Sequence, residues 1–126
     1  MLEKSKKHSS ALDFHTDAYT YETMSFEKPL FRSIDTAIVL TMKNSSRRPS
    51  YTWQLNQYRP CKNVVIQTNQ GRAFKRGIDN TAQDLFHAFA AACRYVENGP
   101  VLLVEDDVCF KITAEDTRSI DSFLTS

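Results

Sequence analysis

The chain has 126 residues, of which 41% are hydrophobic and 25% charged, with only 3 glycines and 4 prolines. This composition is typical of one globular domain and argues against collagen-like, disordered and membrane-spanning proteins. Because 16 basic side chains nearly balance 15 acidic ones, the formal charge of +1 indicates neither a nucleic-acid-binding surface nor a polybasic membrane anchor.

Residues 1–30 are rich in Ser, Lys, His and Thr and lack a sustained hydrophobic period, so we expect a polar N-terminal extension. Residues 31–126 are expected to form the folded domain. The basic start has no apolar run behind it and does not resemble a secretory signal or a membrane anchor. Three widely spaced cysteines, Cys61, Cys93 and Cys109, predict reduced thiols that fill the core of a cytoplasmic protein.

Strands and helices are predicted to alternate after the extension. The aliphatic and β-branched run at 34–42 predicts a strand covered on both faces. Helix-start residues near Pro49 and a stop at Pro60 predict a short helix between them. The run at 63–69 predicts a second strand.

The longest helix is predicted to begin at Asn80, which forms a capping-box pattern with Gln83, and to end before Gly99. The stripe expected to face the sheet consists of Ala82, Leu85, Phe86, Phe89, Ala92, Cys93 and Val96. A third strand follows in "VLLV" at 101–104. This order predicts the α/β class, with a three-layer, Rossmann-like parallel sheet and helices on its faces.

Polar side chains follow each predicted strand. Thr41 and Lys43 lie at the end of the first strand, Asn69 ends the second, and three consecutive acids end the third. Ligands of open parallel sheets bind beyond the carboxyl ends of the strands, so we expect a site at this edge. If the third strand stays extended, Glu105 and Asp107 point to one side. Two carboxylates on one side could hold Mg²⁺ or Mn²⁺, with the phosphates of a nucleotide completing the ligand shell. The alternative is that the acids only cap or solubilise a turn.

The string "VLLVEDD" resembles two families. One is the receiver domain of response regulators, but its phosphate-accepting aspartate and later units would have to follow, and only residues 108–126 remain. The other is the GT-A-type glycosyltransferases, in which an acidic D-x-D-type motif ends a strand after a nucleotide-binding βαβ half. This resemblance covers residues 34–112, and the helix before the acids is reminiscent of lipopolysaccharide-type and large-DNA-virus enzymes.

The resemblance implies a role for each acid. Asp107 would bind Mn²⁺ or Mg²⁺ on the diphosphate of a nucleoside-diphosphate sugar, with Glu105 facing the ribose or the metal shell. Asp106 would support Glu105 or touch the donor sugar, while Thr41 and Lys43 would hold the nucleoside. The bound cation would stabilise the departing nucleoside diphosphate as a Lewis acid.

The resemblance also implies an acceptor-binding half after the acidic strand, carrying the catalytic base of inverting members. Residues 111–126 are too few for it, so we expect an apparently truncated, GT-A-like donor-binding domain. Its partners would be the sugar nucleotide and a saccharide or glycoconjugate acceptor, without nucleic acid. The alternative is a non-catalytic α/β binding or interaction domain in which the acids are structural.

Overall fold

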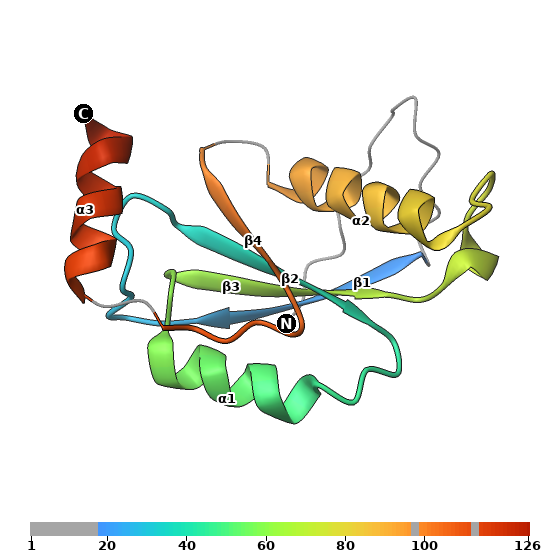
Figure 1. The fold of residues 1–126 in the computed structure, drawn as a ribbon, viewed down its shortest axis with the longest axis horizontal. Helices are drawn as coiled ribbons and strands as arrows, with labels where there is room; N and C mark the ends of the chain where they lie inside the picture. Colours follow the sequence, from blue (N-terminus) through green and yellow to red (C-terminus); the bar gives the residue numbers. More distant parts are fainter. Residues whose placement is uncertain (1–17, 97–98, 112–113) are drawn as a thin grey trace.

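The computed structural model describes residues 18–96, 99–111 and 114–126. Their secondary structure alternates strands and helices, as the sequence predicts, with one strand added at the start and one helix at the end (Figure 1). The elements are β1 (Tyr19–Ser25), β2 (Thr36–Met42), α1 (Arg48–Tyr58), β3 (Asn63–Asn69), the 3-10 helix η1 (Arg72–Phe74), α2 (Thr81–Tyr95), β4 (Val101–Glu105) and α3 (Ala114–Thr125).

The four strands form one mixed sheet in the order β1-β3-β2-β4. β2 lies parallel to both β3 and β4. Helix α1 connects β2 to β3 and helix α2 connects β3 to β4, the helical crossovers that parallel strands require. β1 is antiparallel to β3. The predicted α/β class is therefore confirmed, whereas the prediction of an all-parallel sheet is wrong at its β1 edge.

The edge strand β1 lies within the segment expected to be an extension. Its side chains alternate, so that Tyr19 and Tyr21 are buried at 6% exposure each while Thr20 and Glu22 are exposed. The Tyr21 ring stacks on Tyr95 of α2 at a centroid distance of 4.1 Å. The boundary expected at residue 30 therefore does not separate this strand from the domain. A two-residue period over only seven residues is a weak signal beside the polar composition around it.

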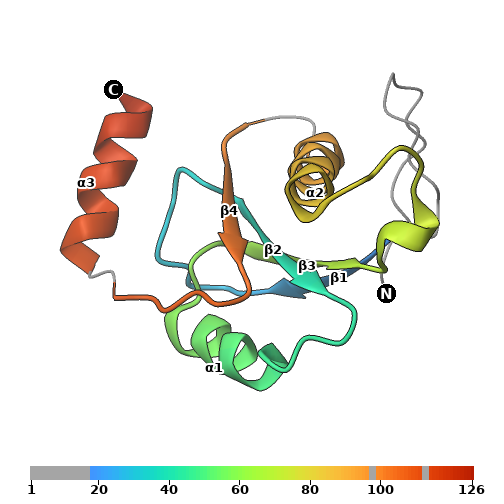
Figure 2. The same cartoon turned by 45° about the vertical axis from the view of Figure 1, so that its right-hand side comes forward.

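Helices α1 and α2 lie on opposite faces of the sheet (Figures 1 and 2). Alternation along the strands sends Val39 and Ile66 to the α1 face, and Leu40 and Val65 to the α2 face. The α1-side core comprises Phe31, Ile34, Ala37, Val39, Tyr51, Leu55, Cys61, Val64 and Ile66. The α2-side core comprises Ala18, Tyr19, Tyr21, Ile38, Leu40, Val65, Ala88, Ala91 and Ala92.

Helix α2 faces the sheet with only part of the predicted stripe. Asn80 caps the helix as predicted, accepting a hydrogen bond from the Gln83 backbone N–H at 2.9 Å. Leu85 and Phe86, however, are 40% and 70% exposed. Of the other predicted residues, Ala92 is buried, and Phe89 and Val96 pack against the α2-side core. The remaining buried residues of the helix were not predicted; they are Asp84, His87, Ala88 and Ala91. The small alanines let the helix lie close to the sheet, and the polar contacts of Asp84 set its rotation.

The three cysteines are free, but only Cys61 is buried. Burial, together with the nearby carboxylates of Asp35 and Asp121, raises the pKa of its thiol to about 12. Cys93 and Cys109 are exposed, so the expectation that all three thiols fill the core is wrong for two of them.

Helix α3 was not predicted from the sequence. Asp121 on this helix accepts hydrogen bonds from the backbone N–H groups of Arg32 and Ser33, both at 2.9 Å, and from the Ser33 hydroxyl. These contacts hold α3 against the loop between β1 and β2. Within the part of the chain that the structure describes, no helix is long and apolar enough to cross a membrane.

Candidate functional site

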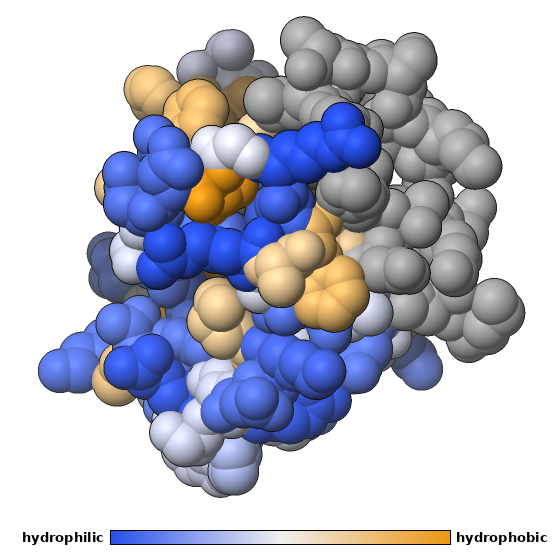
Figure 3. Space-filling model, turned by 90° about the vertical axis from the view of Figure 1, so that its right-hand side faces the viewer, coloured by the Kyte–Doolittle hydropathy of each residue, from blue (hydrophilic) through white to orange (hydrophobic). Residues whose placement is uncertain are grey.

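A cleft of about 680 Å³ lies where β2, β3 and β4 end, between these strand ends and the first half of α2. Figure 3 views this side of the molecule and shows small hydrophobic patches between hydrophilic residues. Met42 and Leu85, both lining the cleft, are 50% and 40% exposed. The lining residues are Leu40, Thr41, Met42, Lys43, Asn44, Ser45, Ser46, Arg47, Gln67, Asn69, Gln70, Thr81, Asp84, Leu85, Ala88, Glu105 and Asp106.

Four of the five site residues predicted from the sequence line this cleft: Thr41, Lys43, Glu105 and Asp106. Asp107 is exposed and is not part of the lining. The reason is that β4 ends at Glu105 and the chain turns, with the Val108 N–H donating to the Glu105 carbonyl at 3.1 Å. The extended geometry that would have sent Glu105 and Asp107 to one side therefore does not continue past the strand.

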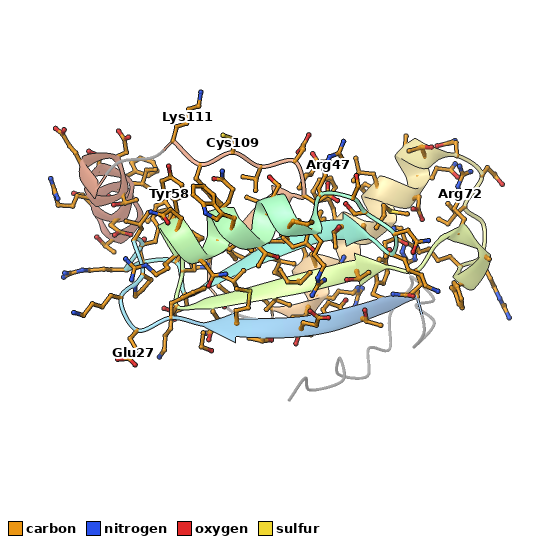
Figure 4. The ribbon with its side chains drawn as sticks, turned by 90° about the horizontal axis from the view of Figure 1, so that it is seen from below. Glu27, Arg47, Tyr58, Arg72, Cys109 and Lys111 are labelled. Atoms are coloured by element: carbon orange, nitrogen blue, oxygen red, sulfur yellow. The ribbon has the colours of Figure 1, made fainter. Side chains whose placement is uncertain are left out.

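Asp106 is the buried member of the acidic triplet, at 8% exposure. Its Oδ2 atom accepts hydrogen bonds from the hydroxyls of Thr41 at 2.8 Å and Ser45 at 2.7 Å. Its Oδ1 atom pairs with Arg47 at 3.1 Å. Asp106 thus connects the end of β2, the loop after it and the start of α1, where Figure 4 places Arg47.

The pKa of Asp106 is set by opposing effects. Burial alone would raise the pKa, but hydrogen bonds from Ser45, Thr41 and Arg47, together with the Arg47 charge, lower it below the ordinary value. Asp106 is therefore a carboxylate at neutral pH. Both of its oxygens already have partners, so it organises this side of the cleft.

A second carboxylate, Asp84, lies on the α2 side of the cleft. It accepts a hydrogen bond from Asn69 Nδ2 at 2.9 Å and forms an ion pair with the Lys75 ammonium. The Lys75 side chain is 0% exposed, donates to Asn69 Oδ1 at 2.7 Å and lies 4.8 Å from the Tyr19 ring centroid. This closed cluster ties the loop after β3 to α2.

His87 lies one turn further along α2 and is buried. Its Nδ1 atom is 2.7 Å from the Tyr19 hydroxyl oxygen, and the two rings are stacked. Burial and the Lys75 charge lower the pKa of His87, and they outweigh the Asp84 charge, which raises it. The lowered pKa favours the neutral ring. These contacts are those of a packing histidine.

Gln67 of β3 is 1% exposed and lines the inner end of the cleft. Its Nε2 atom donates to the Ala88 carbonyl at 3.0 Å. Its Oε1 atom has no hydrogen-bond partner among the described residues. A buried acceptor without a partner costs about 1–3 kcal/mol, so native proteins contain few of them.

The cleft matches only part of the predicted metal site. Glu105 is exposed and lines the cleft, whereas Asp106 already has partners for both oxygens. Residues 18–96, 99–111 and 114–126 contain no group of three or more His, Cys, Asp or Glu side chains arranged to hold a metal. Mg²⁺ bound with substrate phosphates commonly uses only one or two protein carboxylates, so Glu105 fits that arrangement.

Comparison with protein-family models, with curated proteins and with solved structures finds no match for this chain.

Sequence reasoning found the acidic edge of the cleft but missed its inner wall. Gln67 is the polar residue in the otherwise aliphatic run "VVIQ", and that interruption was the available signal. Lys75 lies in a polar loop, where nothing in the sequence marks a fully buried ammonium.

Proposed function

We propose that the chain is a GT-A-like, donor-binding domain that holds a nucleoside-diphosphate sugar in the cleft at the ends of β2, β3 and β4. The observation that carries the proposal is the convergence of Thr41, Lys43, Glu105 and Asp106 on one cleft. Because these residues come from segments more than 60 positions apart, a solvated acidic turn does not explain their convergence. The reaction would be transfer of the sugar to a saccharide or glycoconjugate acceptor.

The diphosphate is proposed to lie between the basic and acidic sides of the cleft. Lys43 and Arg47 supply positive charge at the end of β2 and the start of α1. Glu105 would hold Mn²⁺ or Mg²⁺ together with phosphate oxygens, and Asp107 would complete the shell from the turn after β4. When bound, the cation would neutralise charge on the leaving nucleoside diphosphate.

Asp106 has a different role in this proposal from that of its neighbours. Its carboxylate accepts from Thr41, Ser45 and Arg47, so it would orient the groups that meet the phosphates. The same contacts favour the second candidate function, a non-catalytic α/β interaction domain in which the acids only stabilise the fold. The two candidate functions differ in whether Glu105 and Asp107 bind a metal ion together with a nucleotide.

Calorimetric titration with uridine and guanosine diphosphates, with and without Mn²⁺, tests the proposal. We expect metal-dependent binding that weakens by at least about tenfold in Glu105→Ala and Asp107→Ala. The control is Glu27→Ala, an exposed acid in the loop after β1, remote from the cleft (Figure 4). Absence of nucleotide binding would exclude the donor-binding function. Binding that neither Mn²⁺ nor the two variants change would refute the metal site.

A further inference from the structure

The acceptor atom of Gln67 points to a ligand group that the cleft lacks in its own residues. Gln67 Oε1 is buried and has no partner within the described part of the chain, although Gln67 lines the cleft. Every other buried side-chain nitrogen or oxygen found there has a partner. The missing partner must therefore be a donor.

The orientation of the Gln67 amide is fixed by its neighbour. Nε2 donates to the Ala88 carbonyl at 3.0 Å, and exchanging the amide oxygen and nitrogen would place two acceptors against each other. The atom left without a partner is therefore the oxygen. A ligand at this end of the cleft must present an N–H or O–H group to it.

The surroundings of Gln67 favour a largely apolar group. Leu40 lies beside Gln67 in the pairing of β2 with β3, and Ala88 of α2 covers it. Both line the cleft, together with the partly exposed Met42 and Leu85. Aliphatic walls around a single buried polar atom are the usual lining of a small-molecule site, in which the polar atom fixes orientation.

We propose that Gln67 Oε1 accepts the ring N–H of the nucleobase, which selects uracil or guanine. This inference rests on the proposed function, because it places the base of the nucleoside diphosphate at the inner end of the cleft. A ring N–H brings one hydrogen to one acceptor, whereas the amino group of adenine or cytosine brings two. In adenine and cytosine the neighbouring ring nitrogen also carries a lone pair, which would be repelled by the Gln67 oxygen.

The test compares uridine, guanosine, cytidine and adenosine diphosphates with inorganic pyrophosphate, in Mn²⁺, on the wild type and on Gln67→Met. We expect the wild type to bind the uridine or guanosine diphosphate about tenfold more tightly than the other two nucleotides. Gln67→Met should lose this preference and keep its affinity for pyrophosphate. The control is Gln57→Met, an exposed position on α1.

A second measurement is independent of whether Gln67→Met folds. The preferred nucleotide, methylated at its ring N–H, should bind wild-type protein about tenfold more weakly than the parent nucleotide. If wild type binds no nucleoside diphosphate, both the proposed function and this assignment fail. Only the Gln67 assignment fails if nucleotides bind but neither N-methylation nor Gln67→Met changes their affinity. It also fails if Gln67→Met weakens pyrophosphate binding as much as nucleotide binding. In either case Oε1 is satisfied by water.

Discussion

Asp84 and Asp106 lie on the two sides of one cleft and differ in how their charge is neutralised. Both are nearly buried, at 7% and 8% exposure, and each has one cation and at least one polar side chain as partners. The cation of Asp84 is Lys75, whose side chain is 0% exposed. The cation of Asp106 is Arg47, whose side chain is 60% exposed.

If the proposed function holds, this difference separates a cluster that stabilises the fold, around Asp84, from one that binds a ligand, around Asp106. The Lys75 ammonium is occupied by Asn69, Asp84 and the Tyr19 ring, so it has little capacity left for a ligand. Arg47 carries five N–H donors, pairs with Asp106 through one nitrogen, and keeps more than half of its side chain in solvent. In the proposed function, Asp106 would orient this exposed guanidinium so that its remaining N–H groups bind a phosphate.

The largest effect is expected from breaking the closed cluster. Lys75→Met would leave Asp84 as a buried carboxylate without its cation. Removing one partner of a buried pair typically costs about 3–5 kcal/mol, a large share of the stability of a small domain. Urea denaturation followed by circular dichroism measures the free energy of unfolding.

The double variant Lys75→Met with Asp84→Leu provides the control. Removing both charges should recover much of the lost stability, because the uncompensated carboxylate is gone. A Lys75→Met protein as stable as the wild type would show that the cluster does not hold the loop after β3 to α2.

A smaller effect is expected from Asp106→Asn. The amide keeps the size of the carboxylate but loses its charge-assisted hydrogen bonds with Arg47, Ser45 and Thr41, which should cost about 1.5–3 kcal/mol at neutral pH. Because the pKa of Asp106 is lowered by folding, its stabilisation is complete above the ordinary value of 3.8 and is lost as pH falls through the lower, folded value. Urea denaturation between pH 7 and pH 2 should therefore show the wild type and Asp106→Asn converging only below about pH 4.

A constant difference across that range would mean that the Asp106 charge does not contribute to stability. Asp107→Asn is the matched control. It changes the neighbouring exposed acid and should leave the stability of the fold close to that of the wild type at every pH.

The sequence predicted the order of elements better than their contacts. The strand at 63–69 and the capped helix after Asn80 were found because their patterns are local. The rotation of α2 was predicted wrongly, because Leu85 and Phe86 extend the hydrophobic pattern of the helix and yet are exposed. The helix is rotated so that Asp84 is buried in their place. The ion pair between Lys75 and Asp84 could not be predicted, because only the folded chain brings the two residues together.

The acidic triplet illustrates the same limit within the site. Its position at a strand end predicted a ligand site containing all three acids, and Glu105 and Asp106 line the cleft whereas Asp107 does not. The separate environments of the three acids depend on the turn after β4 and on partners 59 to 65 residues away, such as Arg47 and Thr41. No spacing within "VLLVEDD" contains that information.

The smallest effect on stability is expected from Arg47→Ala, which tests the cluster of Asp106, Thr41, Ser45 and Arg47. An ion pair with a 60% exposed partner contributes little to folding, so the free energy of unfolding should fall by less than about 1 kcal/mol. Affinity for a nucleoside diphosphate should instead fall by roughly three- to tenfold, and the loss should shrink as salt is added, because the lost attraction to phosphate is electrostatic. Arg118→Ala removes the same charge from the exposed face of α3 and should change neither quantity. Equal nucleotide affinity in the two variants would assign Arg47, like Lys75, to the fold alone.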